Sequence, residues 1–388
     1  AYLGYAISGL EAPLLTTLVT LLLLLLYLAG QNERREGLWV VLSGIVLGLV
    51  YLTKEIWILA ALPAVVYLWK LRPEGRLRRP LLLLALALVV SSPWLVRNYR
   101  LTGNPFFTLR YIELFEQTKR YPGNSLHRTF DQHLPNFFAF AAQNPRAIAQ
   151  KIQDGMLMFY RTVPAIAGLY VTPLFLVAIL VALGNRNFEL WRYLIYACAI
   201  IVAFGLSLLT AAPRLLIPIG PAVLVIATGY FWRLLDQRLE PIPVPLRGRT
   251  ISLAVGLLLL LHFVPLGATL MPEGLEAAAP VDTVLSAAVQ LNDQSSGLVV
   301  TDVPWLVAWV ADRDALWLPQ TPADLHKCEQ AVGRFQWLLL SPMLTRIARR
   351  EGLDRWAEVW ARGLRADTEY LDFVVEARLS TGRWILLK

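Results

Sequence analysis

The stretch Ala12–Gly30, APLLTTLVTLLLLLLYLAG, decides the fold of this chain. It contains no charged residue and is about as long as a membrane-crossing helix, which needs roughly 20 apolar residues. Further apolar runs follow it, about eight in all counting the first, and each is predicted to span a membrane. They are Leu38–Thr53, Ile56–Trp69, Pro80–Val96, Val163–Gly184, Tyr193–Ala212, Leu215–Trp232 and Ile251–Met271.

The composition supports a membrane protein with an appended domain. Of the 388 residues, 56% are hydrophobic and 16% are charged, whereas a soluble domain carries about 25% charged residues. The shortage of charge lies in the first part of the chain. We therefore expect a mainly α fold, in which residues 1–271 form a transmembrane helical bundle and residues 272–388 form a small α/β domain.

The net charge of +8 raises the possibility of nucleic-acid binding. The basic residues argue against it, because they gather in short gaps between the apolar runs, as cytoplasmic loops do. Those residues are Arg34, Arg35, Lys70, Arg72, Arg76, Arg78, Arg79, Arg186, Arg192, Arg233, Arg238, Arg247 and Arg249. The basic charge therefore indicates membrane topology, and no nucleic-acid partner is expected.

The basic gaps also predict the orientation in the membrane. Successive gaps alternate between the two sides of the membrane, and four basic gaps fall on the same side, which is predicted to be cytoplasmic. These gaps are Gln31–Gly37, Lys70–Arg79, Asn185–Arg192 and Arg233–Thr250. The opposite, outer side contains Ala1–Glu11, Lys54–Glu55, the long loop Arg97–Thr162, Pro213–Arg214 and the tail. A multi-pass cell-membrane protein with an extracytoplasmic C-terminal domain is expected.

Local patterns refine the two outer segments. In the long loop, the amphipathic stretches Phe106–Phe115 and Ile148–Tyr160 are interpreted as helices at the membrane interface. In the tail, alternating strand and helix patterns predict an α/β domain. The predicted strands are Leu298–Val300, Ala315–Leu318, Gln336–Leu340, Phe373–Ala377 and Trp384–Leu387, and the predicted helices are Val281–Leu291, Pro322–Val332 and Asp354–Gly363.

Charges at the outer ends of the runs are the candidate site residues, because ionisable groups near a bilayer often carry function. Lys54 is either an interfacial lysine paired with Glu55 or a clamp for a phosphate. Arg214 is either an interfacial anchor or an anion contact beside a helix N-terminus. Arg97 and Asn98 end the fourth run and are either solvated or able to recognise sugar and phosphate.

Other candidates have simpler explanations. Glu11 could be a general base, but Ser8 and Glu11 also match a capping box. His127, Asp131 and His133 are too loosely spaced to predict a metal site. The lone His262 is interpreted as a packed residue of an apolar helix, and Cys198 and Cys328 cannot form a disulfide framework within the tail.

Several short motifs together resemble one family. They are Tyr5–Leu14, Gly44–Gly48 with Leu52–Glu55, Pro93–Asn98 with Thr102–Pro105, Pro213–Pro218, Thr301–Trp305 and Leu316–Pro319. In these segments the chain resembles the bacterial dolichyl-phosphate-mannose–protein mannosyltransferase-like glycosyltransferases. These are GT-C-fold enzymes, similar to the aminoarabinose transferase that modifies lipid A.

The resemblance implies a membrane enzyme. Family members move a sugar from a polyprenyl-phosphate donor to a hydroxyl of a glycan, lipid or protein acceptor on the outer face of the membrane. By motif position, Lys54 and Arg214 would bind the donor phosphate, and a divalent cation sometimes assists in the family. Arg97, Asn98 and Glu55 would line the donor and acceptor cavity, and Glu11 would lie at its rim.

One departure from the family pattern concerns the catalytic acid. In the family the acidic motif precedes the segment that Tyr5–Leu14 resembles. The chain begins with Ala1, and Ala1–Leu10 lacks the features of a signal peptide. We expect further sequence upstream that supplies the acid.

The alternative functions are a non-catalytic membrane scaffold or accessory subunit that keeps the fold, and a lipid or polysaccharide transporter. The scarcity of charge inside the apolar runs argues against the transporter. The tail is expected to bind or position the acceptor.

Overall fold

The computed structural model of the chain describes residues 12–129, 134–168, 171–182, 184–239, 248, 250–257, 260, 289–291, 297–333, 335, 337–364, 369–370, 373–379 and 383–387. The chain forms two compact units. Unit 1 comprises Ala1–Tyr111 and Ile148–Gly267, and unit 2 comprises Ile112–Ala147 and Ala268–Lys388. Much of the long loop therefore belongs with the tail, whereas the sequence prediction had placed it with the membrane helices.

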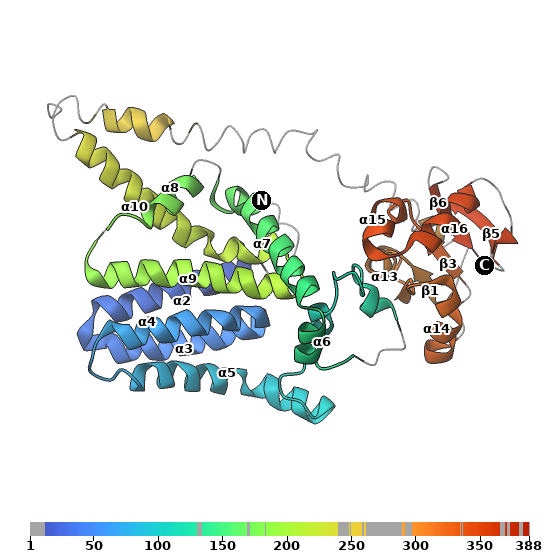
Figure 1. Ribbon diagram of the computed structural model, residues 1–388, viewed down its shortest axis with the longest axis horizontal. Coiled ribbons are helices and arrows are strands. Elements are labelled where there is room, and N and C mark those ends of the chain that lie inside the picture. The colour runs from blue at the N-terminus through green and yellow to red at the C-terminus, as the bar shows by residue number, and fades with distance from the viewer. Residues whose placement is uncertain are drawn as a thin grey trace. The chain divides into compact units, whose positions relative to one another are not determined.

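Unit 1 is helical. Its main helices are α2 (Ala12–Gln31), α3 (Glu36–Thr53), α4 (Ala61–Leu71), α5 (Arg78–Thr102), α7 (Pro145–Ala167), α8 (Val171–Ala178), α9 (Arg186–Leu208) and α10 (Gly220–Leu239). Short 3₁₀ turns join them at η1 (Glu33–Arg35), η2 (Glu55–Ala60) and η5 (Pro213–Ile219). Helix α3 packs between α2 and α5, and α9 packs against α2 and α4 (Figure 1).

Five helical segments of the described residues are long and apolar enough to cross a membrane: Ala12–Gln31, Glu33–Thr53, Arg78–Thr102, Arg186–Leu208 and Arg214–Gln237. They correspond to five of the predicted runs. The predicted run Ile56–Trp69 instead forms η2 and the short α4. The predicted run Val163–Gly184 is divided between the end of α7 and the short α8. Most of the predicted run Ile251–Met271 lies outside the described residues.

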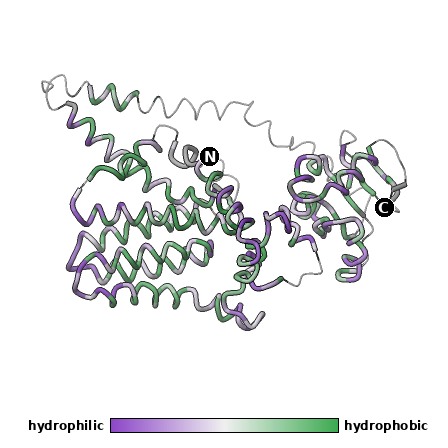
Figure 2. Tube along the Cα trace, in the orientation of Figure 1, coloured by the Kyte–Doolittle hydropathy of each residue, from purple (hydrophilic) through white to green (hydrophobic). Residues whose placement is uncertain are grey.

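The surface of these helices suits a hydrocarbon environment. Leu81, Leu88 and Val89 on α5 are 63%, 57% and 65% exposed. Figure 2 shows apolar colour along the lengths of α2, α3, α5 and α9, with polar residues concentrated toward their ends. A soluble protein rarely exposes so much contiguous apolar surface. These helices are compatible with membrane insertion.

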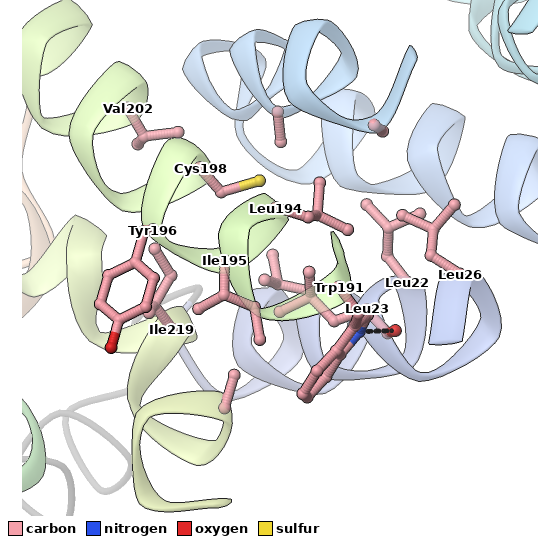
Figure 3. Close-up of a cluster of buried hydrophobic side chains, with 14 of the residues drawn as sticks. Leu22, Leu23, Leu26, Trp191, Leu194, Ile195, Tyr196, Cys198, Val202 and Ile219 are labelled. Carbon is pink, nitrogen blue, oxygen red and sulfur yellow. Dashed lines mark hydrogen bonds between the residues drawn. The ribbon is translucent and has the colours of Figure 1, made fainter. Parts of the chain in front are cut away.

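The core of unit 1 lies where α2, α9 and η5 meet. Leu22, Leu26 and Ile195 are almost completely buried there, beside Leu23 and Trp191 (Figure 3). The Trp191 indole N–H donates to the Leu23 carbonyl at 2.7 Å, as the dashed line in Figure 3 shows. This bond satisfies the one polar atom that a buried tryptophan side chain brings into an apolar core.

Glycines bring α3 and α5 into close contact. A Cβ atom built on Gly44 would lie 2.8 Å from the Leu83 carbonyl oxygen, and one on Gly48 would lie 2.6 Å from Cβ of Val90. Small residues spaced four apart allow such an approach between membrane helices, whose association is driven by packing and polar contacts rather than by exclusion of water. The Gly44–Gly48 pair therefore sets the distance between α3 and α5.

Proline inside α5 is compensated locally. Pro93 has no N–H to donate to the Val89 carbonyl one turn earlier. The Ser92 hydroxyl donates to that carbonyl at 2.7 Å instead. The helix therefore continues beyond the predicted end at Val96 and stops at Thr102, where Gly103 adopts a left-handed conformation with φ of +74°.

Contacts between the loops divide unit 1 into two ends. At the first, called the Arg72 end, Arg72 lies 3.2 Å from Glu33 and 3.4 Å from Glu36, and the Asn187 amide donates to the Gly30 carbonyl at 2.7 Å. This end contains three of the predicted cytoplasmic gaps. The other, called the Lys54 end, contains η2, residues 103–111 and η5. The sides predicted from the basic residues therefore agree with how these loops group in space.

Unit 2 contains a mixed sheet. Its described strands, in the spatial order β2-β1-β3-β6-β5-β4, are β2 (Ala315–Trp317), β1 (Val299–Thr301), β3 (Trp337–Leu340), β6 (Trp384–Leu387), β5 (Phe373–Leu379) and β4 (Glu369–Tyr370). Strands β1, β2 and β3 are parallel to one another. Strand β6 pairs antiparallel with β3, β5 pairs antiparallel with β6, and β4 pairs antiparallel with β5. All five predicted strands coincide with observed ones.

Both faces of this sheet are buried at β1, β3 and β6, which explains why these strands are continuously apolar. Val299 and Leu339 pack on the face covered by α13 (Pro304–Val310). Val300 and Leu338 point to the other face, which α15 (Leu344–Glu351) and α16 (Asp354–Leu364) cover. Alternate side chains of a strand face opposite sides, so each strand contributes to both cores.

The remaining elements of unit 2 are short. They are η4 (Ser125–Arg128), α6 (Phe137–Gln143), η7 (Pro322–Asp324) and α14 (Leu325–Val332). The predicted helices Pro322–Val332 and Asp354–Gly363 match η7 with α14 and α16, whereas α13, α15 and β4 were not predicted. Of the predicted helix Val281–Leu291, only residues 289–291 are described, and these are helical.

The α3–α5 contact predicts the effect of enlarging Gly48. We expect Gly48→Ala to lower stability by about 1–3 kcal/mol, because the added methyl meets Val90 and the backbone of α5. Gly37→Ala is the matched control on the same helix, since a Cβ there meets nothing within 4 Å. Thermal unfolding of the detergent-solubilised protein measures both. Equal melting temperatures for the two variants would contradict this view of the contact.

Candidate functional site

The Lys54 turn ends α3 and reverses the chain. Lys54 is extended, with φ of −154° and ψ of 102°. Its N–H still donates to the Val50 carbonyl at 2.9 Å, and its own carbonyl accepts from the Trp57 N–H at 3.0 Å. The chain passes directly into η2. Lys54 and Glu55 are both partly exposed at its tip.

Trp57 connects this turn to the Arg214 turn. Its side chain is completely buried, and its indole N–H donates to the Leu215 carbonyl at 3.0 Å. In a 3₁₀ turn that carbonyl would accept from residue 218, but Pro218 has no N–H to give. The bond therefore pairs a buried donor with a carbonyl that proline cannot serve, and it holds η2 against η5.

Arg214 lies in the first residues of η5, next to this bond. Its guanidinium is exposed and has no hydrogen-bond or ion-pair partner among the residues that the structure describes. The Lys54 and Arg214 turns, predicted to face the same side of the membrane, are thus at the same end of unit 1. Two cationic residues at this end suit an anionic ligand.

Glu55 is held by the segment that follows α5. The Thr108 hydroxyl donates to Glu55 Oε1 at 2.7 Å, and Arg110 Nε lies 4.0 Å from the same oxygen. Thr108 also accepts from the Arg110 backbone N–H at 3.1 Å. Sequence reasoning missed both partners because it treated Phe106–Phe115 as an interfacial helix. Only Leu109–Leu114 of this stretch is helical, as the 3₁₀ segment η3, because Asn104-Pro105 is followed by a turn.

Arg97 and Asn98 have different environments at the end of α5. Asn98 is 5% exposed, and its side-chain amide donates to the carbonyls of Pro105 and Phe107 at 3.4 and 3.2 Å. This side chain fixes the loop after α5. Arg97 is exposed and stacks over the Trp94 ring at 4.7 Å. Only Arg97 of the two presents its polar group to solvent.

Other predicted residues lie outside the described part of the chain. Glu11 is one of them, as are Asp131, His133 and His262. Within the described residues, no three His, Cys, Asp or Glu side chains come together in a way that could hold a metal ion. The nearest carboxylate to Lys54 in sequence, Glu55, already bonds Thr108. The described residues therefore do not fit a divalent cation, and no chemical step is assigned to one.

A second polar cluster lies in unit 2, at the carboxyl ends of the parallel strands. Asp302 follows β1 and is completely buried; its two carboxylate oxygens accept from the Ser341 N–H at 2.9 Å and the Ser341 hydroxyl at 2.5 Å. Ser341 follows β3. Ligands of α/β proteins usually bind at this edge, where the strand order reverses.

The long loop closes this edge with Arg128. Arg128 is 4% exposed, and its guanidinium stacks 4.1 Å over the Trp317 ring and donates to the Leu318 carbonyl at 3.1 Å. The Gln320 N–H in turn donates to the Arg128 carbonyl at 3.0 Å. Asn124 from the same loop donates twice to the Glu351 carboxylate, at 2.8 and 3.2 Å. The segment before Arg128 is therefore an integral part of unit 2.

Burial shifts the ionisation of this cluster. It raises the pKa of Asp302 to about 6, opposed by the hydrogen bonds from Ser341. It lowers the pKa of Arg128 to about 10, opposed by the carboxylates of Glu351, Asp302 and Glu116. Burial also lowers the pKa of His127. Sequence reasoning had singled out His127 only as a possible metal ligand.

Comparison with known proteins gives one match. Residues 14–219 match a family described as a domain of unknown function, DUF8201. The chain belongs to this family. No curated protein and no solved structure matches it. The matched region ends with η5, so Lys54 and Arg214 both lie within the family domain and the strands of unit 2 lie beyond it. The family description assigns no activity, so the resemblance to glycosyltransferases stays a prediction.

The ionisation of Asp302 predicts a pH effect on unit 2. Its folded-state pKa of about 6 lies above the ordinary value of 3.8, so the native state binds the proton more tightly than the unfolded state. Stability is therefore expected to fall as the pH rises from 4 to 7, by about 2 kcal/mol. Asp302→Asn should remove this dependence, because an amide can still bond Ser341.

Hydrogen-exchange mass spectrometry on peptides covering 299–341 tests this at each pH. Wild-type and variant are compared at the same pH, so the intrinsic exchange rate cancels. Asp312→Asn, which changes an exposed aspartate of the same unit, is the control and should follow the wild type. An Asp302→Asn protein that loses protection with pH as the wild type does would show that Asp302 is not the group responsible.

Proposed function

We propose that this chain belongs to a membrane glycosyltransferase that moves a sugar from a polyprenyl-phosphate donor to a hydroxyl acceptor on the outer face of the membrane. Three features support the proposal: the short motifs that resemble such enzymes, the apolar helices with lipid-compatible surfaces, and the cationic Lys54 end. The observation that carries it is the buried Trp57–Leu215 bond, which brings the Lys54 and Arg214 turns together.

The chemistry of a lipid-linked sugar fits this arrangement. Such a donor has a hydrocarbon tail, which needs an apolar environment, and a phosphate, which needs cations at the membrane surface. In the transfer, the acceptor oxygen bonds to the anomeric carbon and gives its proton to a base. The bond from that carbon to the phosphate oxygen breaks, and its electron pair stays on the phosphate. Lys54 and Arg214 would stabilise the charge that develops there.

Arg214 is the better placed of the two cations for this role. Its guanidinium is exposed and without a partner among the described residues, and it can form two parallel bonds to a phosphate. It also lies at the start of η5, where N–H groups are not all used within the turn. Glu55, fixed by Thr108 and Arg110, is then positioned to orient the acceptor or the loop above it.

The proposal places the Lys54 end outside the cell and the Arg72 end in the cytoplasm. Cysteine labelling tests this, because the native Cys198 and Cys328 are both buried. A membrane-impermeant maleimide should label Arg214→Cys in intact cells and Arg34→Cys only after permeabilisation. The reverse pattern would put the proposed phosphate contacts in the cytoplasm and rule out a donor on the outer face.

Loss of the cations should remove transfer. We expect Arg214→Ala and Lys54→Ala each to reduce the transfer rate by about 10²–10³-fold, the effect of deleting one group that stabilises developing charge. Arg34→Ala, at the Arg72 end, is the control and should keep the wild-type rate. Transfer is measured in reconstituted membranes with a radiolabelled polyprenyl-phosphate sugar and the full-length protein.

The two results distinguish the enzyme from the alternative. Wild-type rates for Arg214→Ala would show that this residue does not bind the donor phosphate. No transfer by any protein, including the wild type, combined with tight association with another membrane protein, would favour the non-catalytic scaffold instead.

A further inference from the structure

Two exposed tryptophans on α13 of unit 2 have no structural explanation. Trp305 is 59% exposed and Trp309 is 90% exposed. They are four residues apart, so they lie on the same face of the helix. The opposite face buries Val307 and Ala311 in the core of the unit, which fixes the orientation of α13. Large aromatic side chains held in water on a firmly packed helix indicate a binding surface.

Trp305 adjoins the polar cluster at the carboxyl edge of the sheet. Its ring meets the Trp317 ring edge-on, with 6.0 Å between centroids. Trp317 in turn lies beneath the Arg128 guanidinium, and the His127 ring is 6.2 Å away at an angle of 34°. Trp305 follows β1 and Trp317 ends β2, so this array stands where α/β sheets usually bind ligands.

The array contains polar atoms that the protein does not satisfy. Nε of Arg128, Nε1 of Trp317 and Oε1 of Gln320 are buried and have no hydrogen-bond partner among the described residues. Arg128 as a whole is 4% exposed. Buried donors and acceptors are nearly always paired, with protein, water or a ligand. These atoms lie below the surface, so a ligand does not reach them directly, but the exposed His127 ring beside Trp317 offers polar atoms at the surface itself. An exposed aromatic surface next to polar groups favours a ligand that has both apolar faces and hydroxyl groups.

We propose that this edge of unit 2 binds a carbohydrate. A pyranose ring has faces of C–H groups that pack on the electron-rich face of an indole, and its hydroxyls both donate and accept hydrogen bonds. Trp305 and Trp309 supply the stacking surface, and the exposed His127 beside Trp317 bonds the hydroxyls directly or through ordered water. That the bound glycan is the acceptor of the transfer rests on the proposed function; the binding itself does not.

Saturation-transfer NMR on the full-length protein in nanodiscs tests the binding, with chitohexaose, maltohexaose and mannohexaose as probes and no donor present. We expect at least one of them to bind, and Trp305→Ala and Trp309→Ala each to weaken its binding by about three- to tenfold. Phe138→Ala is the matched control, because Phe138 is an exposed aromatic of the same unit, 79% exposed on α6. It should bind as the wild type does.

A second measurement separates a glycan from a lipid surface. Brominated phospholipid in the nanodisc quenches tryptophans that touch the bilayer, and the emission intensity lost to quenching is compared between the wild type and the Trp305→Phe, Trp309→Phe double variant. Equal losses support the proposal. A quenched component lost in the double variant, or no binding of any of the three sugars, overturns it. Since neither measurement requires transfer, both outcomes leave the proposed glycosyltransferase activity to its own test.

Discussion

The hydrogen bond from the Trp57 indole to the Leu215 carbonyl is the constraint on which the Lys54 end depends. It joins segments 158 residues apart in the sequence, inside an apolar core where an unpaired N–H or carbonyl would cost about 1–3 kcal/mol. Pro218 makes the carbonyl available, and Trp57 needs an acceptor because it is completely buried. The buried Trp57 indole and the carbonyl left without a donor by Pro218 therefore satisfy each other's hydrogen-bonding needs. The two turns that carry Lys54 and Arg214 are held together by a bond that involves neither cation.

The helices around this bond are held together by close packing and by hydrogen bonds within the protein, which do not depend on the exclusion of water. In a membrane, exclusion of water contributes little to helix association, so close contact and internal hydrogen bonds must do the work. The approach of Gly44 and Gly48 to α5 supplies the contact, and the Ser92–Val89 bond restores the hydrogen bond that Pro93 removes. A rigid arrangement of α3 and α5 follows, and it fixes the ends from which Glu55 and Thr108 reach each other.

Features that repeat along the chain could be predicted from the sequence, and features that depend on one distant partner could not. Apolar length predicted α2 and α9, the placement of basic residues predicted which loops group together, and alternating patterns predicted strands such as Trp384–Leu387. The bond of Asn98 to the loop after α5 and the contact of Thr108 with Glu55 leave no periodic signal, because each is a single side-chain contact that local patterns do not encode.

The same reasoning explains why residues 112–147 of the long loop belong to unit 2. Their polar side chains meet groups that the tail leaves buried: Asn124 meets the Glu351 carboxylate, and Arg128 meets the Leu318 carbonyl. A buried carboxylate or carbonyl without such partners would be strongly destabilising. The tail therefore needs the loop, and the loop is covalently continuous with the segment that holds Glu55. Chain connectivity thus links the two sets of polar residues, one suited to an anionic lipid headgroup and the other to a hydroxyl-rich ligand.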